Sequence, residues 1–143
     1  MNDIMVEWEI DSKINKSNIL EETLRGPGLH QKYLDLLHKH KNKNIKLQYD
    51  LSKLKLNKYR YYRGEMSKAD LDDIGWDQYQ GLKPLKTDMN FILDNDPDIA
   101  DIVVKIKYIE NIISTLESIL YQIKSRDWQI KNHIEWSKFQ AGV

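Results

Sequence analysis

An apolar repeat near the carboxyl terminus restricts the fold of this chain more than any other feature. Between residues 99 and 134, apolar side chains recur at alternating steps of three and four, and Asp127 is the one polar residue in the series. This spacing places the side chains on one face of an α-helix, as heptad repeats do. Further apolar residues at 103, 112 and 119 make the stripe wider than a two-stranded seam. We therefore predict a long helix that packs against several others.

A stripe this broad is expected to need cover from a second copy of the chain. The sequence thus predicts self-association through Ile102, Ile106, Ile109, Ile113, Leu116, Leu120, Ile123, Ile130 and Ile134.

The start of this helix is marked by Asp96-Pro97-Asp98, with Asp96 as N-cap and proline at the first helical position. A second long helix is predicted over residues 28–64, because Gly26-Pro27-Gly28 should break the chain and Gly64 is a typical C-cap. This segment also carries a heptad-like seam, with a polar middle.

The remaining segments have weaker patterns. Residues 1–25 predict short N-terminal helices, and residues 65–96 predict an acidic loop region with a small hairpin around 76–92. A chain of 143 residues fits one domain. We therefore expect a mainly α protein with a single domain over 1–143, in which residues 97–141 form the apolar oligomerisation helix or helices.

Charge is distributed unevenly along the chain, although its formal net charge is zero. Residues 32 to 63 hold ten basic residues against two acidic ones, and the rest of the chain has the opposite excess. A basic face on a neutral protein is typical of polyanion binding. The amino terminus does not resemble a signal peptide, and no segment approaches the ~20 apolar residues of a membrane span, so a soluble intracellular protein without a membrane partner is expected.

The basic residues form a row when residues 28–64 are helical. Lys32, Lys39, Lys46, Lys53 and Arg60 are seven residues apart, so they follow one side of the helix at intervals of roughly 10 Å. Tyrosines among the cations at the helix end could stack on bases. The candidate residues for binding single-stranded DNA are Lys32, Lys39, Lys46, Lys53, Lys55, Lys58, Tyr59, Arg60, Tyr62 and Arg63. The alternatives are a solvated face, or a non-enzymatic helical assembly or adaptor protein whose basic row makes salt bridges between subunits.

The sequence contains no recognisable catalytic or metal-binding set, so we expect neither an enzyme nor a cofactor. Cysteine is absent, and His38 and His40 point apart on a helix. Asp70, Asp72, Asp73 and Asp77 have no neighbouring histidine in the sequence, and they are not taken as a nuclease site. No glycine-rich nucleotide loop is present.

Two blocks of sequence resemble the UvsY family of recombination mediators from T4-like bacteriophages. The first lies between Ile123 and Gly142: Ile-Lys-Ser-Arg, an aromatic residue, Ile-Lys, a later Ile, and a Phe-x-Ala-Gly end. The second is a basic helix end that runs into Tyr61-Tyr62-x-Gly64. An acidic segment and an apolar helix lie between them in the same order, so the resemblance covers roughly residues 30–142.

The resemblance implies a ring-like homo-oligomer that binds single-stranded DNA, contacts a phage recombinase and a phage single-strand binding protein, and helps to load the recombinase. It places the protein in the cytoplasm of the infected bacterial host. Basic residues before the Tyr-Tyr pair contribute to DNA binding in the family, and they match Lys58 and, with a departure from the pattern, Leu56. The C-terminal segment is tied to self-association.

Overall fold

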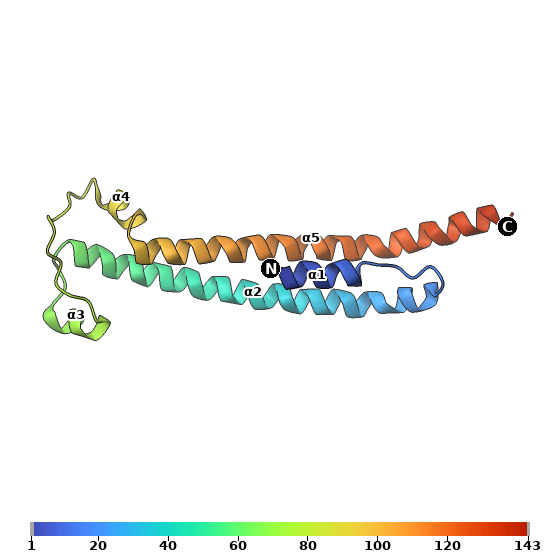
Figure 1. Cartoon of the computed structure of the whole chain (residues 1–143), viewed down its shortest axis with the longest axis horizontal. Helices are drawn as coiled ribbons and strands as arrows, with labels where there is room; N and C mark the ends of the chain where they lie inside the picture. The colour runs from blue at the N-terminus through green and yellow to red at the C-terminus, as the bar shows by residue number, and fades with distance from the viewer. Residues whose placement is uncertain (1, 143) are drawn as a thin grey trace. The chain divides into compact units, whose positions relative to one another are not determined.

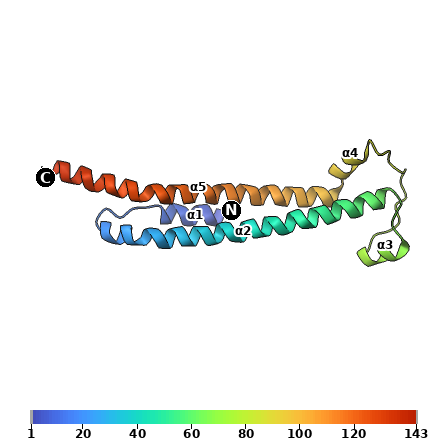
Figure 2. The same cartoon turned by 180° about the vertical axis from the view of Figure 1, so that it is seen from behind.

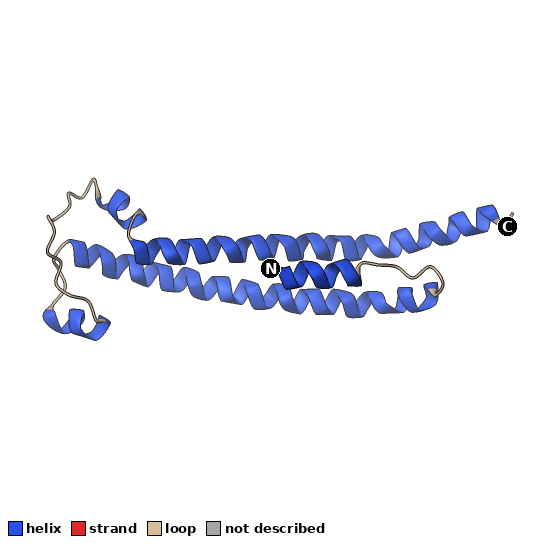
Figure 3. Cartoon of the chain, in the orientation of Figure 1, coloured by secondary structure: helices blue, strands red, loops and turns tan. Residues whose placement is uncertain are grey.

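The computed structural model describes residues 2–142, which form five helices and no strand (Figure 1 and Figure 3). In chain order these are α1 (Asn2–Asp11), α2 (Ile19–Tyr62), α3 (Lys68–Ile74), α4 (Met89–Asp94) and α5 (Pro97–Gln140). The predicted mainly α fold with two long helices is confirmed.

The chain divides into two compact units. The first holds the residues up to Asn42 and those from Ile109 onward, and the second is Lys43–Tyr108. Both long helices contribute residues to each unit. The single domain over 1–143 stays a prediction.

The first unit has a core made from three helices, and Figure 1 and Figure 2 both show α1 beside α2 and α5. Tyr33 of α2 and Leu116 of α5 are fully buried, and Trp8 of α1 meets the Tyr33 ring edge-on with 5.4 Å between the ring centroids. The other buried members are Leu29, Leu37, Ile119, Leu120 and Ile123. The short helix α1 is thus held by an aromatic contact with α2.

The predicted break at residues 26–28 is wrong, because α2 continues through Pro27. Long-range contacts hold the helix on both sides of the proline. Glu22 forms a buried ion pair with Arg126 of α5, and Leu29 lies in the core with 5% of its surface exposed. Gly26 lies close to α5, since a Cβ at this position would be 3.6 Å from an Asp127 carboxylate oxygen. The last residues of the predicted N-terminal segment 1–25 therefore form the first turns of α2, which begins at Ile19.

The second unit has a smaller core at the start of α5. Met89 and Leu93 of α4 are buried with Ile99 of α5, and Leu51 and Leu54 of α2 pack against them. The predicted N-cap Asp96 of α5 and the predicted C-cap Gly64 of α2 are both confirmed here. Asp96 caps α5 through its Oδ1 atom, which accepts hydrogen bonds from the backbone N–H groups of residues 98 (2.9 Å) and 99 (3.2 Å).

The predicted C-cap Gly64 lies two residues after Tyr62, the last residue of α2, and has a φ of 69°, a left-handed conformation that glycine tolerates best.

The predicted hairpin around 76–92 is wrong. Residues 76–85 have no regular structure, and Met89–Asp94 form α4 instead of a strand. Met89 and Leu93 are four residues apart, so a helix turns both side chains into the core of the second unit, whereas a strand would also present alternate residues such as Phe91, which is 73% exposed. The acidic segment also contains α3, which Ser67 caps at its start and Gly75 at its end.

Burial of most of the α5 seam does not require a second chain. Within each unit, the helices of the same chain cover it. Of the nine residues predicted for self-association, six are buried and two are partly buried, while Ile134 is 38% exposed. The seam is therefore mostly the core of the chain itself, and self-association through these residues stays a prediction.

No helix among residues 2–142 combines the length and the apolar character that a membrane crossing requires.

Replacing Pro27 by alanine tests the continuity of α2. Alanine restores the missing N–H and removes the ring that clashes with the preceding turn, so Pro27→Ala should raise the free energy of unfolding in urea by up to about 3 kcal/mol. Pro97→Ala is the matched control, because the first helical N–H has no partner within the helix. Both substitutions raise the conformational entropy of the unfolded chain to a similar extent. Equal effects of the two substitutions would mean that α2 is interrupted at Pro27.

Candidate nucleic-acid interface

The predicted row of cations lies on α2, but its members have different environments. In the first unit, Lys32 is bound by two carboxylates of α1: its Nζ atom is 2.7 Å from Asp11 Oδ2 and 3.0 Å from Glu7 Oε2. These hydrogen bonds raise the pKa of Lys32. Tyr33 donates a hydrogen bond of 2.8 Å to the same oxygen of Asp11. Lys32 therefore fastens α1 to α2, whereas Lys39 is exposed and makes no ion pair within residues 2–142.

In the second unit, three of the candidate lysines on α2 are open to solvent. Lys46 is 72% exposed and lies 3.2 Å from Asp50, one turn further on. An exposed pair of this kind holds a lysine weakly. Lys53 and Lys55 are exposed and form no ion pair among the described residues. All three ammonium groups are therefore accessible to phosphates.

Apolar side chains lie among these lysines on the solvent side of α2. Ile45, Tyr49 and Leu56 are 67%, 60% and 61% exposed, and their spacing of four and seven residues places them on one stripe. The Nζ atom of Lys53 lies 5.2 Å from the centroid of the Tyr49 ring. We call the set Ile45, Lys46, Tyr49, Lys53 and Leu56 the outer face of α2.

Tyr49 is not among the residues predicted from the sequence, whose aromatic members, Tyr59 and Tyr62, lie at the end of the helix. Two signals were available: Tyr49 lies four residues before Lys53, and it falls outside the seam formed by Leu47, Leu51 and Leu54.

Lys58 is the most buried of the candidate residues, with 8% of its surface exposed. Its Nζ atom lies 2.8 Å from Asp98 Oδ2 and 3.2 Å from Asp96 Oδ2, both at the start of α5. The same ammonium group is 4.5 Å from the centroid of the Trp76 ring. Burial by itself would lower the pKa of Lys58, but the hydrogen bonds to the two aspartates raise it. The structure gives Lys58 a structural role, and its part in DNA binding stays a prediction.

Tyr62 shares the Asp96 carboxylate with Lys58. Its hydroxyl group donates a hydrogen bond of 2.6 Å to Asp96 Oδ2. Burial and this bond to a carboxylate raise the pKa of Tyr62. Burial acts in the same upward direction on the pKa of Asp96, but the hydrogen bonds from Tyr62, the Ile99 backbone and Lys58 outweigh it and lower that pKa. Asp96 therefore stays ionised and joins the end of α2 to the start of α5.

The remaining candidates at the end of α2 are partly buried. Arg60 lies 3.2 Å from Asp70 of α3, and Arg63 lies 3.6 Å from Glu65. Tyr59 packs against the core of the second unit. Of the ten candidate residues, Lys39, Lys46, Lys53 and Lys55 thus remain as exposed cations on α2.

An aromatic cluster covers Lys58 from the side of the loop. Tyr61 contacts Trp76 edge-on, with centroids 5.3 Å apart, and Tyr79 contacts both Tyr61 and Tyr62. These rings are used in packing against each other, which leaves Tyr49 as the exposed aromatic side chain beside the lysines of the outer face.

The site has the chemistry of a binding surface. Ammonium groups on an exposed helix attract phosphates, and a tyrosine face can stack on a base without reading its sequence. Within residues 2–142, no group of three or more His, Asp or Glu side chains is placed to hold a metal ion.

The family model for "Recombination, repair and ssDNA binding protein UvsY" matches residues 7–143 of this chain. The chain belongs to the UvsY family. The resemblance predicted from the Ile123–Gly142 and Tyr61–Gly64 blocks is thereby confirmed.

Solved structures agree with the family at the level of the fold. Two crystal forms of the bacteriophage T4 recombination mediator protein UvsY superpose on the chain with a TM-score of 0.86 and 20% sequence identity. Lattice type II covers 99% of this chain and 97% of the T4 chain, and lattice type I covers 96% and 98%. No curated protein matches the chain.

Substitution of the lysines on α2 should separate a structural role from a binding role. Lys58→Ala leaves the buried Asp96 without its cation, so the free energy of unfolding should fall by about 3 to 5 kcal/mol. Lys53→Ala removes an exposed cation and should change it by less than about 0.5 kcal/mol. Urea denaturation followed by circular dichroism measures both. A Lys58→Ala protein as stable as the Lys53→Ala protein would show that the ion pairs of Lys58 with Asp96 and Asp98 do not stabilise the fold.

Proposed function

We propose that this protein is a recombination mediator that binds single-stranded DNA and helps to load a phage recombinase onto DNA coated with single-strand binding protein. Its family is described as recombination, repair and single-stranded DNA binding. The observation that carries the proposal in this chain is the outer face of α2, where exposed Lys46 and Lys53 lie beside exposed Tyr49.

The outer face suits a flexible strand better than a rigid duplex. Phosphates would meet the lysines, and bases that are free of pairing would stack on Tyr49, at about 1 to 3 kcal/mol per base. Ile45 and Leu56 add apolar surface next to the ring. Since neither kind of contact reads a base edge, binding would show little sequence preference.

One such face makes few phosphate contacts, so tight binding would need several copies. We propose that the chain acts as a homo-oligomer, with a ring as the expected form, in which repeated faces hold one strand by avidity. A strand held in this way would be released more easily by the single-strand binding protein and presented to the recombinase. These two phage proteins are the proposed partners, and the site of action is the cytoplasm of the infected host cell. The protein would act without catalysis.

Salt dependence of binding to oligo-dT tests the outer face. The logarithm of the binding constant should fall linearly with the logarithm of salt concentration, with a slope of about −0.7 for each phosphate neutralised. Replacing Lys46 and Lys53 of the outer face together with the neighbouring exposed Lys55 by alanine should weaken binding and make the slope shallower by about 2. Fluorescence anisotropy of a labelled oligonucleotide measures both quantities.

The control variant replaces Lys86, Lys105 and Lys107 by alanine, which removes the same charge from exposed positions of the same unit. Its slope should stay close to that of the unchanged protein. Equal losses in both variants would mean that net charge, and not the outer face, governs binding. An outer-face variant that binds normally but dissociates as an oligomer would favour the adaptor protein.

A further inference from the structure

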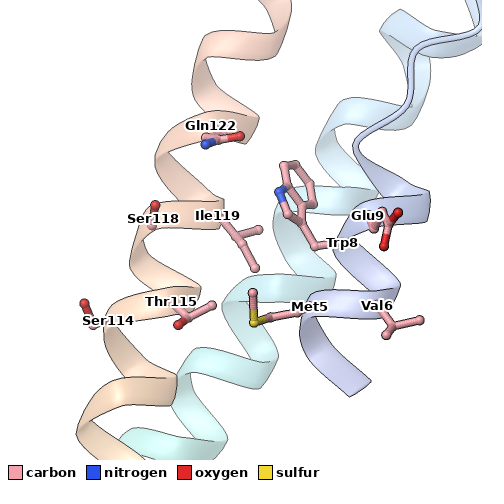
Figure 4. Close-up of a pocket in the computed structure, with 9 residues that line it drawn as sticks. All are labelled: Met5, Val6, Trp8, Glu9, Ser114, Thr115, Ser118, Ile119 and Gln122. Atoms are coloured by element: carbon pink, nitrogen blue, oxygen red, sulfur yellow. The ribbon is translucent and has the colours of Figure 1, made fainter. Parts of the chain in front are cut away.

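Helix α5 has three different sides in the first unit. One side carries buried core residues such as Leu116 and Ile123. A second side lines a groove toward α1, and Figure 4 shows Ile119 of α5 and Trp8 of α1 on the two walls of this groove. The residues of the third side belong neither to the core nor to the groove, so this side faces solvent.

The third side is a row of two aromatic and two basic side chains. Tyr121, Lys124, Trp128 and Lys131 follow each other at steps of three, four and three, which places them within a sector of about 80° around the helix axis. Tyr121 and Trp128 are 72% and 68% exposed. Both lysines are exposed and form no ion pair among residues 2–142. We call these four residues the outer face of α5.

The carboxylates near this face do not neutralise it. Glu117, one turn before the face, lies 3.8 Å from Lys41 Nζ of α2. Glu135, one turn after the face, is exposed and forms no ion pair within the described residues. Asp127 lies next to α2, since a Cβ at Gly26 would be 3.6 Å from its Oδ1 atom. The outer face of α5 therefore keeps its positive charge.

The outer face of α2 in the second unit has the same chemistry. On each helix an exposed ring, Tyr49 or Trp128, lies between two exposed lysines. The two lysines are seven positions apart in both cases, which is about 10 Å along the helix axis. The arrangement from which we propose DNA binding on α2 is thus present a second time, on a different helix.

Single-stranded DNA fits the outer face of α5 better than another protein does. Rings and cations alternate along this face, as bases and phosphates alternate along a strand, so stacking and charge contacts can form together. A protein partner would have to cover the two lysines that flank Trp128, and lysine is depleted from protein interfaces. Water can still reach both ammonium groups when a strand lies on the face.

We propose that Tyr121, Lys124, Trp128 and Lys131 form a second binding face for single-stranded DNA. Bases stack on Tyr121 and Trp128, and the two lysines contact the phosphates beside them. This inference rests on the proposed function and adds a site to the one on α2. Each unit of the chain then carries one DNA-binding face, so one copy contacts more phosphates than the outer face of α2 provides.

Photochemical cross-linking tests the contact directly. Irradiated 5-bromouracil couples to aromatic side chains that lie against it, so an oligonucleotide that contains this base should label Trp128 or Tyr121, as well as Tyr49. Mass spectrometry of the digested protein locates the adducts. Trp136 is the internal control, because it is 58% exposed but has no lysine three or four positions away, and it should stay unlabelled. Equal labelling of Trp136 and Trp128 would mean that exposure alone causes labelling, and the proposal would be wrong.

Substitutions measure how much the face contributes to binding. Trp128→Ala removes one stacking surface and should weaken oligo-dT binding roughly fivefold to hundredfold. Phe91→Ala is the control, because Phe91 is 73% exposed but lies between Asp88 and Asp94, each three positions away, and this variant should bind normally. Replacing Lys124 and Lys131 together by alanine should make the salt slope shallower by about 1.4.

Analytical ultracentrifugation of the same variants tests whether the face is instead a contact between copies. Trp128→Ala should sediment like the unchanged protein. Loss of the oligomer in this variant, or binding of oligo-dT as tight as that of Phe91→Ala, would overturn the proposal.

The positions of the adducts separate this inference from the proposed function. Adducts on Tyr49 with none on Tyr121 or Trp128 refute the second face and leave the proposed function intact. Adducts on Trp128 with none on Tyr49 support the second face and refute DNA binding by the outer face of α2. A chain that neither binds oligo-dT nor forms adducts refutes both.

Discussion

Burial of the α5 seam by helices of the same chain is the constraint on which the other features depend. In the first unit, Leu116 and Tyr33 lose all contact with solvent, and in the second unit Ile99 is buried with α4 residues and packs against α2. Because α2 turns one side toward this seam, its opposite side must face solvent. The exposure of Tyr49 and Lys53 is therefore a consequence of core packing and needs no separate cause.

Each unit uses one aspartate to join two helices. In the first unit, Asp11 at the end of α1 accepts hydrogen bonds from Lys32 and Tyr33 of α2. In the second unit, Asp96 before α5 accepts a hydrogen bond from Tyr62 and pairs with Lys58. A lysine and a tyrosine of α2 meet one carboxylate in both cases. Two cations of the predicted basic face thus serve the fold, while the lysines between them in sequence stay accessible.

The sequence predicted those features that local residues determine. Asp96 before Pro97 specifies a helix start whatever surrounds it, and the spacing of the α5 seam specifies its buried face. The predictions failed where contacts between residues that are distant in sequence determine the structure. Pro27 stays within α2 because packing on both sides offsets the tendency of proline to break a helix. Lys58 is buried and pairs with the carboxylate of Asp96, which directly precedes α5. Pattern analysis along one helix contains no information about either contact.

A chain that covers its own apolar seam can still assemble, provided that it keeps separate surfaces for the purpose. Trp136 and Phe139 near the end of α5 are 58% and 74% exposed, so the core of the first unit does not use them. Self-association through surfaces of the first unit would use none of the five residues of the outer face of α2, because these residues lie in the second unit. Binding of a DNA strand to the outer face of α2 and assembly of copies would then use different parts of the chain, so the number of copies could raise affinity without competing with DNA for the lysines of that face.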